Sequence, residues 1–363
     1  MKTATIKLTV ALLALILAAL ALYAILHYRP EQPGGQTLPT TAPSATTQPA
    51  DTLAPPDTAP PTVATVPEPT LVTTPNLPDQ VTGADIPGIF AGKAFVYDCT
   101  DDTYLYMKNT EYTKLYPASI TKLMSAYLIL QYLQPEERFT FTEEIAAVVA
   151  GDASVSGLEV GDIATVRDLL YGTLLTSGSD SVHTLTVNIG WRLANDPTLE
   201  AIEAERVFVE KMNETAAAIG MTHTHFTNCD GYPNYFLATT IHDVVLLGKL
   251  CLQAPELVKI MSTPSYTMDL GNGKTLEQYN GNWLVIPWSE YYTPEAVGMK
   301  TGTTKAAGAC LLSAFRVGGK EYLIGVFQCE DHYDRLEQTL RLYRGVVLGE
   351  TVEYTPPETT EAK

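Results

Sequence analysis

The stretch of residues 30–88 limits where this chain can fold, because it is dense in proline and threonine and has few large apolar residues. Such a composition cannot bury a core, so we expect a disordered, extended spacer here. In the polyproline II conformation, at ~3.1 Å per residue, roughly 55 residues would reach on the order of 170 Å. A folded domain is therefore expected only after the spacer, over residues 89–350, with a polar tail at 351–363.

An apolar run at residues 8–26 precedes the spacer and follows Lys2 and Lys7. A run of about 20 residues is long enough to cross a bilayer as a helix. A cleaved signal peptide has a shorter apolar core that ends at small residues, for which Ala19-Leu20-Ala21 is a candidate site. Because the run continues past that site, we favour an uncleaved signal anchor at residues 1–29, a single transmembrane helix with the folded domain outside the cell membrane. If the segment is cleaved, the protein is secreted.

Charge and cysteine usage exclude several classes of function. The formal net charge of −18 argues against a nucleic-acid partner, because binding to phosphates needs clustered lysine and arginine. Five cysteines without a C-x-x-C pair indicate neither a disulfide framework nor a zinc site. We expect Cys310 and Cys329 to lie close together across a hairpin as packed thiols rather than as a bridge. His223 and His225 have no third ligand at metal-binding spacing, so we predict no metal site there.

The apolar pattern predicts strands at both ends of the folded region and helices between them. Strands are expected at residues 93–98 and 104–107, at 298–303, and at 310–317 and 321–328. Helices are expected at residues 119–133, from 142, from 165 to about 176, and at 181–190, 203–219, 240–252 and 331–347. This order is typical of an α+β fold, in which helices pack on an antiparallel sheet, and not of a doubly wound parallel fold.

Residues 116–124 combine a turn, a proline before a helix start and, three residues apart, Ser119 and Lys122. Residues three apart share a face in the first helical turn. A hydroxyl held beside an amine at a helix start is a layout for an activated serine nucleophile. About one S-x-x-K is expected by chance in a chain of this length, so other motifs must decide.

Two further motifs follow in order, Ser177-Gly178-Ser179 and Lys300-Thr301-Gly302. This combination is typical of penicillin-interacting serine enzymes. With it, the sequence resembles the serine-type D-alanyl-D-alanine carboxypeptidases, the low-molecular-weight penicillin-binding proteins, over roughly residues 91–349. Segments outside the three motifs that also resemble the family are residues 168–172, 208–213, 220–228 and 298–308.

The resemblance implies both a fold and an activity. The fold is β-lactamase/transpeptidase-like: an antiparallel sheet with helices on both faces and an all-helical lobe. The activity is cleavage of the terminal D-alanine from peptidoglycan stem peptides that end in D-Ala-D-Ala, through an acyl-enzyme on Ser119. β-Lactams are expected to acylate the same serine. The resemblance implies no metal or organic cofactor.

The resemblance also assigns catalytic roles that chemistry supports. Ser119 would be the nucleophile, and a serine hydroxyl needs a base within hydrogen-bond reach. Lys122 would be that base, because burial and a second cation, Lys300, would lower its pKa. Ser177 would pass a proton to the leaving amine.

Substrate binding is expected along residues 300–303. Lys300 and Thr301 would bind the C-terminal carboxylate. Gly302 would let the substrate backbone approach the strand. The backbone N–H groups of Ser119 and Thr303 would form the oxyanion hole.

One position departs from the family. The third residue of the second motif is usually asparagine, and here it is Ser179. Asparagine offers an acceptor and a donor on a longer arm, so we expect Ser179 to reach less well to both Lys122 and the substrate amide. Losing one such hydrogen bond would cost roughly 1–3 kcal/mol, or about ten- to a hundredfold in rate.

Two alternatives remain open. A β-lactamase on the same fold would need a second general base for deacylation, and the nearest candidates, Glu200, Glu203 and Glu205, are expected in or beside a helix. A β-lactam or muropeptide sensor, or a scaffold without activity, is the other. Only residues 1–7 are expected in the cytoplasm, which leaves no room for a signalling domain there.

Overall fold

The computed structural model describes residues 86–354, except 109–111, 113 and 272, and all of them belong to the unit formed by residues 62–363. The predicted signal anchor, nearly all of the predicted spacer and most of the polar tail lie outside the described residues. Among the helices of the described part, none is long and apolar enough to cross a membrane.

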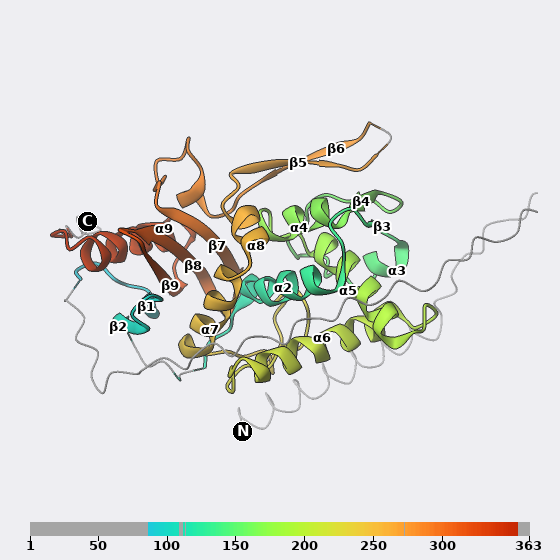
Figure 1. Cartoon of the computed structure of the whole chain (residues 1–363), viewed down its shortest axis with the longest axis horizontal. Helices are drawn as coiled ribbons and strands as arrows, with labels where there is room; N and C mark the ends of the chain where they lie inside the picture. Colours follow the sequence, from blue (N-terminus) through green and yellow to red (C-terminus); the bar gives the residue numbers. More distant parts are fainter. Residues whose placement is uncertain (1–85, 109–111, 113, 272, 355–363) are drawn as a thin grey trace, which may run out of the picture. The chain divides into compact units, whose positions relative to one another are not determined.

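A five-stranded antiparallel sheet joins the two ends of the described region, with strand order β2-β1-β9-β8-β7 (Figure 1). Its strands are β1 (Lys93–Asp98), β2 (Thr103–Lys108), β7 (Ala296–Thr304), β8 (Gly308–Val317) and β9 (Lys320–Cys329). Both predicted hairpins are therefore confirmed. Strand β7 lies at an edge of the sheet, so its outer side is available to other groups.

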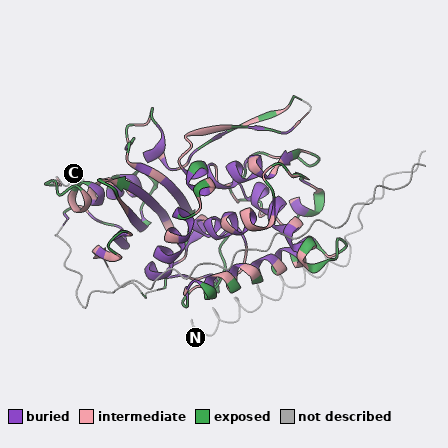
Figure 2. Cartoon of the chain, in the orientation of Figure 1, coloured by how far each residue is buried: buried purple, intermediate pink, exposed green. Residues whose placement is uncertain are grey.

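Helices cover both faces of this sheet. The β1 residues Ala94 and Val96 pack in one apolar cluster, which includes Leu336 of α9 (His332–Leu342). The alternate residues Phe95 and Tyr97 pack in a second cluster with the helices on the other face. Figure 2 shows most of the sheet as buried, in agreement with the fully buried pattern of β1, whereas the edge strand β2 is mostly half-buried. Two covered faces explain why the strands read as nearly continuous apolar runs.

A helical lobe packs beside the sheet. It contains the 3-10 turn η1 (Ala118–Thr121) and helices α2 (Lys122–Tyr132), α3 (Glu143–Ala146), α4 (Val166–Leu174), α5 (Ser179–Ala194), α6 (Ala201–Ala218), α7 (Ile241–Leu252) and α8 (Pro255–Met261). Helix α2 contacts α4, α5, α6 and α7, which explains why it is apolar nearly all round. The predicted α+β class, with helices on both faces of an antiparallel sheet, is confirmed.

Several elements differ from the sequence prediction. The two-stranded antiparallel sheet of β3 (Arg138–Thr140) and β4 (Ile163–Thr165), and the hairpin of β5 (Ser265–Asp269) and β6 (Thr275–Tyr279), were not predicted. Neither were α8 and the 3-10 turn η2 (Trp283–Val285). Strands of three residues give no readable alternation, and β5 is largely exposed or half-buried. The closing helix ends at Leu342 and continues as a π turn, Tyr343–Val347.

The five cysteines are all free thiols. Cys329 pairs with Ala309 in the β8–β9 register, which places it beside Cys310 in the sheet. The expectation of packed thiols rather than a bridge is confirmed. His223 and His225 are exposed, as expected.

Candidate active site

Ser119 and Lys122 meet at the start of the central helix. Pro117 precedes the 3-10 turn η1, which carries Ser119, and Lys122 is the first residue of α2. The Nζ atom of Lys122 lies 3.3 Å from Ser119 Oγ. The α-helix thus begins three residues later than predicted, but the 3-10 turn still brings the two side chains together.

Ser179 joins this pair from the first residue of α5. Its Oγ lies 3.3 Å from Lys122 Nζ and donates a hydrogen bond of 2.7 Å to Asp230 Oδ2. Lys122 also donates to the backbone oxygen of Asp230, at 2.9 Å. Of the two contacts for which Ser179 was expected to be short, the one to Lys122 is therefore made, because the start of α5 lies close to α2; the contact to the substrate amide stays a prediction.

The two lysines of the motifs are both buried, each with 1% of its surface exposed. Burial lowers the pKa of Lys122, and the nearby Asp230, Cys229 and Asp180 oppose this shift. Burial, together with the positive charges of Lys122 and Arg335, holds the pKa of Lys300 well below its usual range. Burial is thus the main cause of both shifts in pKa, and at Lys300 the positive charge of Lys122 adds to it.

The structure does not connect Ser177 to this network. Its backbone has a positive φ of 64°, which is strained for a residue other than glycine. Its Oγ is buried and makes no hydrogen bond to any residue that the structure describes. A buried hydroxyl without a partner is unusual, and Ser177 is not among the residues that line the cavity over Ser119.

Strand β7 supplies two residues to the cavity wall. Thr303 and Thr304 line the cavity, whereas Lys300, Thr301 and Gly302 are not among its lining residues. Lys300 Nζ donates to the backbone oxygen of Thr301 at 3.1 Å. At Gly302, a Cβ atom would lie 3.2 Å from the backbone nitrogen of Ser119 and 3.1 Å from the oxygen of Pro117. The structural reason for this glycine is therefore the close approach of η1, in addition to any approach of substrate.

Arg335 of α9 is a neighbour of the site that the sequence prediction missed. Its guanidinium donates to the backbone oxygen of Gly302 at 3.3 Å and to Thr303 Oγ1 at 3.1 Å. It thus holds the end of β7 that faces Ser119.

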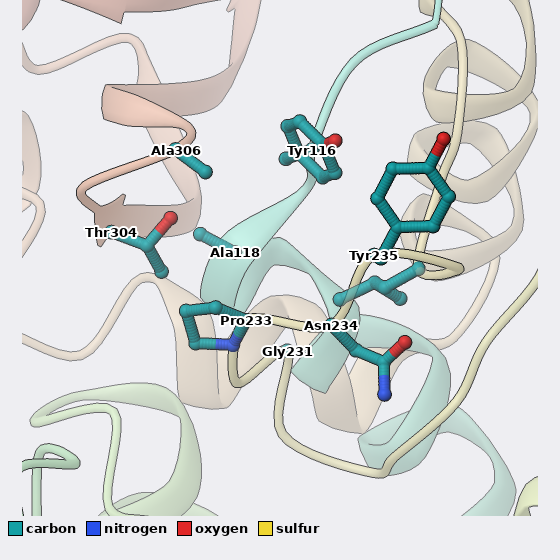
Figure 3. Close-up of a pocket in the computed structure, with 9 residues that line it drawn as sticks. Tyr116, Ala118, Gly231, Pro233, Asn234, Tyr235, Thr304 and Ala306 are labelled. Atoms are coloured by element: carbon teal, nitrogen blue, oxygen red, sulfur yellow. The ribbon is translucent and has the colours of Figure 1, made fainter. Parts of the chain in front are cut away.

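A cavity of about 290 Å³ lies over these groups. Ser119, Lys122 and Ser179 lie on its wall, and its rim is formed by two loops that Asp152 and Tyr232 join through a hydrogen bond of 2.8 Å. A second pocket of about 180 Å³ shares residues Gly231, Pro233 and Thr304 with it. Figure 3 shows this second pocket between Thr304 and Ala306 on one side and Tyr235 on the other.

A cluster of three further side chains, His183, Glu205 and Cys229, is buried next to Asp230. His183 Nδ1 lies 3.2 Å from Glu205 Oε2, and His183 Nε2 lies 3.8 Å from Asp230 Oδ2. Cys229 Sγ lies 3.6 Å from His183 Nδ1. The sequence gave no signal for this cluster, because its members come from α5, α6 and the loop before α7.

Cysteine, histidine and glutamate are ligand types that zinc prefers, and the ligand atoms of these three residues all lie within 4.8 Å of one another. Burial raises the pKa of the Cys229 thiol to about 12, so the thiol keeps its proton. Burial alone would lower the pKa of His183, but Cys229, Asp230 and Glu205 raise it well above its usual range. We therefore describe the cluster as a charged His183 imidazole between the carboxylates of Asp230 and Glu205 rather than as a zinc site.

Comparison with known proteins agrees with this geometry. Residues 80–328 match the sequence profile of the D-alanyl-D-alanine carboxypeptidase family, peptidase S11. The chain belongs to this family.

Among individual relatives of the family, a D-alanyl-D-alanine carboxypeptidase of Streptomyces sp. (strain K15) is 30% identical over 259 residues, which are 69% of this chain and 83% of that protein. The carboxypeptidase DacB2 of Mycobacterium tuberculosis is 31% identical over 58% of this chain and 65% of its own length. The crystal structure of the Streptomyces K15 DD-transpeptidase superposes with a TM-score of 0.65 at 27% identity, covering 73% of this chain and all of that one. This chain is accordingly a serine-type D-alanyl-D-alanine carboxypeptidase, a peptidase with the β-lactamase/transpeptidase-like fold.

Proposed function

We propose that this D-alanyl-D-alanine carboxypeptidase uses Ser119 as its nucleophile and Lys122 as its general base. The observation that carries the proposal is the distance of 3.3 Å between Lys122 Nζ and Ser119 Oγ at the wall of a cavity, with the amine buried. A buried amine with a lowered pKa is the base that a serine hydroxyl requires.

In the proposed reaction, Ser119 Oγ attacks the carbonyl carbon of the bond between the two terminal D-alanines, and Lys122 takes the hydroxyl proton. The C–N bond of the tetrahedral intermediate then breaks. The departing amine receives the proton that Lys122 took, with Ser177 proposed to accept it from Lys122 and donate its own to the amine; the Ser177 hydroxyl has no other partner among the described residues. Water next attacks the ester on Ser119 and releases the shortened stem peptide.

Binding of the substrate is proposed along β7. We propose that Lys300 and Thr301, which precede the cavity-lining Thr303 on this strand but do not line the cavity themselves, hold the carboxylate of the terminal D-alanine. The N–H groups of Ser119 and Thr303 would bind the oxyanion. The close approach of Gly302 to the Ser119 nitrogen supports the last point, because it brings the two segments that would supply the N–H donors next to each other.

β-Lactams such as penicillins, which carry a comparable carboxylate and acyl bond, are proposed to acylate Ser119. For the rest of the chain we propose a membrane anchor at residues 1–29, a spacer at 30–88 and a catalytic domain at 89–350 outside the cell membrane. The apolar run after Lys2 and Lys7, and the proline- and threonine-rich composition that follows, support this arrangement.

The test follows the covalent intermediate. The whole chain, purified in mild detergent, is incubated with benzylpenicillin while its intact mass is followed, and D-alanine release is assayed with diacetyl-L-Lys-D-Ala-D-Ala. We expect a persistent adduct and D-alanine release, both absent in Ser119→Ala. Ser262→Ala, remote from the cavity, is the matched control and should behave as the wild type.

The other outcomes separate the alternatives. An adduct that disappears within minutes would indicate a β-lactamase, although Glu200, Glu203 and Glu205 do not line the cavity. A persistent adduct without D-alanine release would indicate a sensor. If the wild type shows no adduct and no D-alanine release, Ser119 is excluded as the nucleophile.

A further inference from the structure

Four buried side chains of alternating charge lead inward from the cavity: Lys122, Asp230, His183 and Glu205. Lys122 Nζ lies 4.0 Å from Asp230 Oδ2, which lies 3.8 Å from His183 Nε2. His183 Nδ1 in turn lies 3.2 Å from Glu205 Oε2. Each of the four is at most 4% exposed. Buried charges of this kind persist only when they are paired, so we treat them as one unit, the buried charge relay.

The fold of the lobe holds the buried charge relay in place. Ser179 and His183 are four residues apart on α5, so both project towards Asp230. Glu205 reaches His183 because α6 packs tightly on α5: a Cβ at Gly190 would lie 1.9 Å from the backbone oxygen of Ala204. Glu205 Oε1 also accepts from the backbone nitrogen of Cys229, the residue before Asp230, at 3.1 Å.

The hydrogen bonds around Lys122 have a defined direction. Lys122 Nζ has three polar neighbours: Ser119 Oγ, Ser179 Oγ and the backbone oxygen of Asp230. The backbone oxygen can only accept. Ser179 has already committed its single proton to Asp230 Oδ2 at 2.7 Å, so towards Lys122 it can only accept as well. Ser119 is thus the one neighbour of the three that can donate a proton to a neutral Lys122.

We propose that Asp230, which lies between Lys122 and His183, is a positioning residue that fixes the hydrogen bond of Ser179 and so directs the lone pair of Lys122 at Ser119. This inference rests on the proposed roles of Ser119 and Lys122. It gives Ser179 and Asp230 together the task that a single asparagine performs in other members of the family. The Asp230 carboxylate makes no hydrogen bond to Ser119 or to Lys122 Nζ, from which Oδ2 is 4.0 Å away, so it acts on the base through Ser179.

Asp230→Asn tests the direction of the hydrogen bond at atomic detail. Asp230 Oδ1 accepts from the backbone nitrogen of Tyr232 at 2.9 Å, which places the new amide nitrogen at the position of Oδ2. That nitrogen would donate to Ser179 Oγ. The Ser179 hydroxyl would then be free to donate to Lys122 and occupy the lone pair that Ser119 needs.

We expect Asp230→Asn to lower kcat/KM for diacetyl-L-Lys-D-Ala-D-Ala roughly 10- to 100-fold, mainly through kcat. The pH profile gives a readout that a general loss of structure would not change. The negative charge of Asp230 raises the pKa of Lys122, so its removal should move the acid limb of kcat/KM to lower pH. The other charges that act on Lys122 and on its neighbour Lys300, namely Asp180 and Arg335, remain in the variant.

Ser179→Ala is the second variant, since it removes the hydroxyl without changing any charge. It should lower kcat by a similar factor and leave the acid limb in place. In the double variant the loss should be clearly less than the product of the two single losses, because both act through the same hydroxyl. His242→Asn is the matched control, a buried histidine beside Asp243 on α7, and it should keep the wild-type profile.

Three results would overturn the proposal: multiplicative effects in the double variant, an acid limb that does not move in a folded Asp230→Asn, or one equivalent of zinc in the purified chain whose removal abolishes activity. The last would make His183 a ligand rather than a cation. Failure of the proposed function is a distinct result, because in that case the wild type itself would show no acylation by benzylpenicillin.

Discussion

A Cβ atom on Gly231 would lie 1.9 Å from the backbone oxygen of Ala118. The loop that follows Asp230 therefore presses directly on the 3-10 turn that carries Ser119. Gly231 also has a positive φ of 83°, so two independent constraints select glycine here. We expect Gly231→Ala to displace the turn and to abolish most acylation by benzylpenicillin, at a cost of about 2–3 kcal/mol or more in the free energy of unfolding.

Gly318→Ala separates the two constraints. Gly318 has a positive φ of 57° in the turn between β8 and β9, but a Cβ atom there would have no heavy atom within 4 Å. Its substitution should cost only about 1 kcal/mol and leave the acylation rate unchanged. Equal effects of the two substitutions in urea melts and acylation assays would show that the contact with Ala118 is unimportant.

The parts of the site that could be predicted from the sequence are those encoded locally. Ser119 and Lys122 are three residues apart, and the signals for their position, a proline and a following apolar run, lie within the same segment. The hairpins β1–β2 and β8–β9 were equally visible, because their strands are apolar and their turns lie between them.

The residues that complete the site could not be predicted, because their roles arise from tertiary contacts. Asp230 lies more than a hundred residues after Lys122, and nothing in its own segment marks it as a partner of the lysine. The departure at Ser179 was visible, but its compensation depends on how closely α5 and the loop before α7 approach α2. Arg335 lies on a closing helix whose sequence shows only its amphipathic pattern.

Ser179→Asn tests whether the family's usual residue is better in this setting. The amide of asparagine would donate to Asp230 and its carbonyl would accept from Lys122, which keeps the direction of the present hydrogen bonds. We expect D-alanine release to be retained, or to rise about 2- to 10-fold if the longer side chain also reaches the substrate amide. The measurement compares the turnover of the wild type, Ser179→Ala and Ser179→Asn. A folded Ser179→Asn that is as slow as Ser179→Ala would contradict the expectation. A Ser179→Asn with the turnover of the wild type would show that serine at this position does not lower activity.

Lys300→Gln should weaken recognition of the substrate carboxylate. A charge-assisted hydrogen bond is worth about 1.5–3 kcal/mol, so kcat/KM for diacetyl-L-Lys-D-Ala-D-Ala should fall roughly 10- to 100-fold. The matched probe is the same peptide with its C-terminal carboxylate converted to an amide. The variant should discriminate between the two peptides less than the wild type does, and equal discrimination would place the carboxylate elsewhere.

The stability of the fold should depend on pH through His183. Asp230 and Glu205 help to raise the folded-state pKa of His183 well above its usual value, against the effect of burial. A histidine with a raised pKa contributes stability that is fully present below its unfolded pKa, near 6.5, and that is lost as pH rises through the folded pKa. Each unit of that shift is worth about 1.4 kcal/mol. In urea melts, the difference in unfolding free energy between the wild type and His183→Gln should therefore be largest at and below about pH 6.5 and should shrink at alkaline pH. A constant difference would contradict a charged His183.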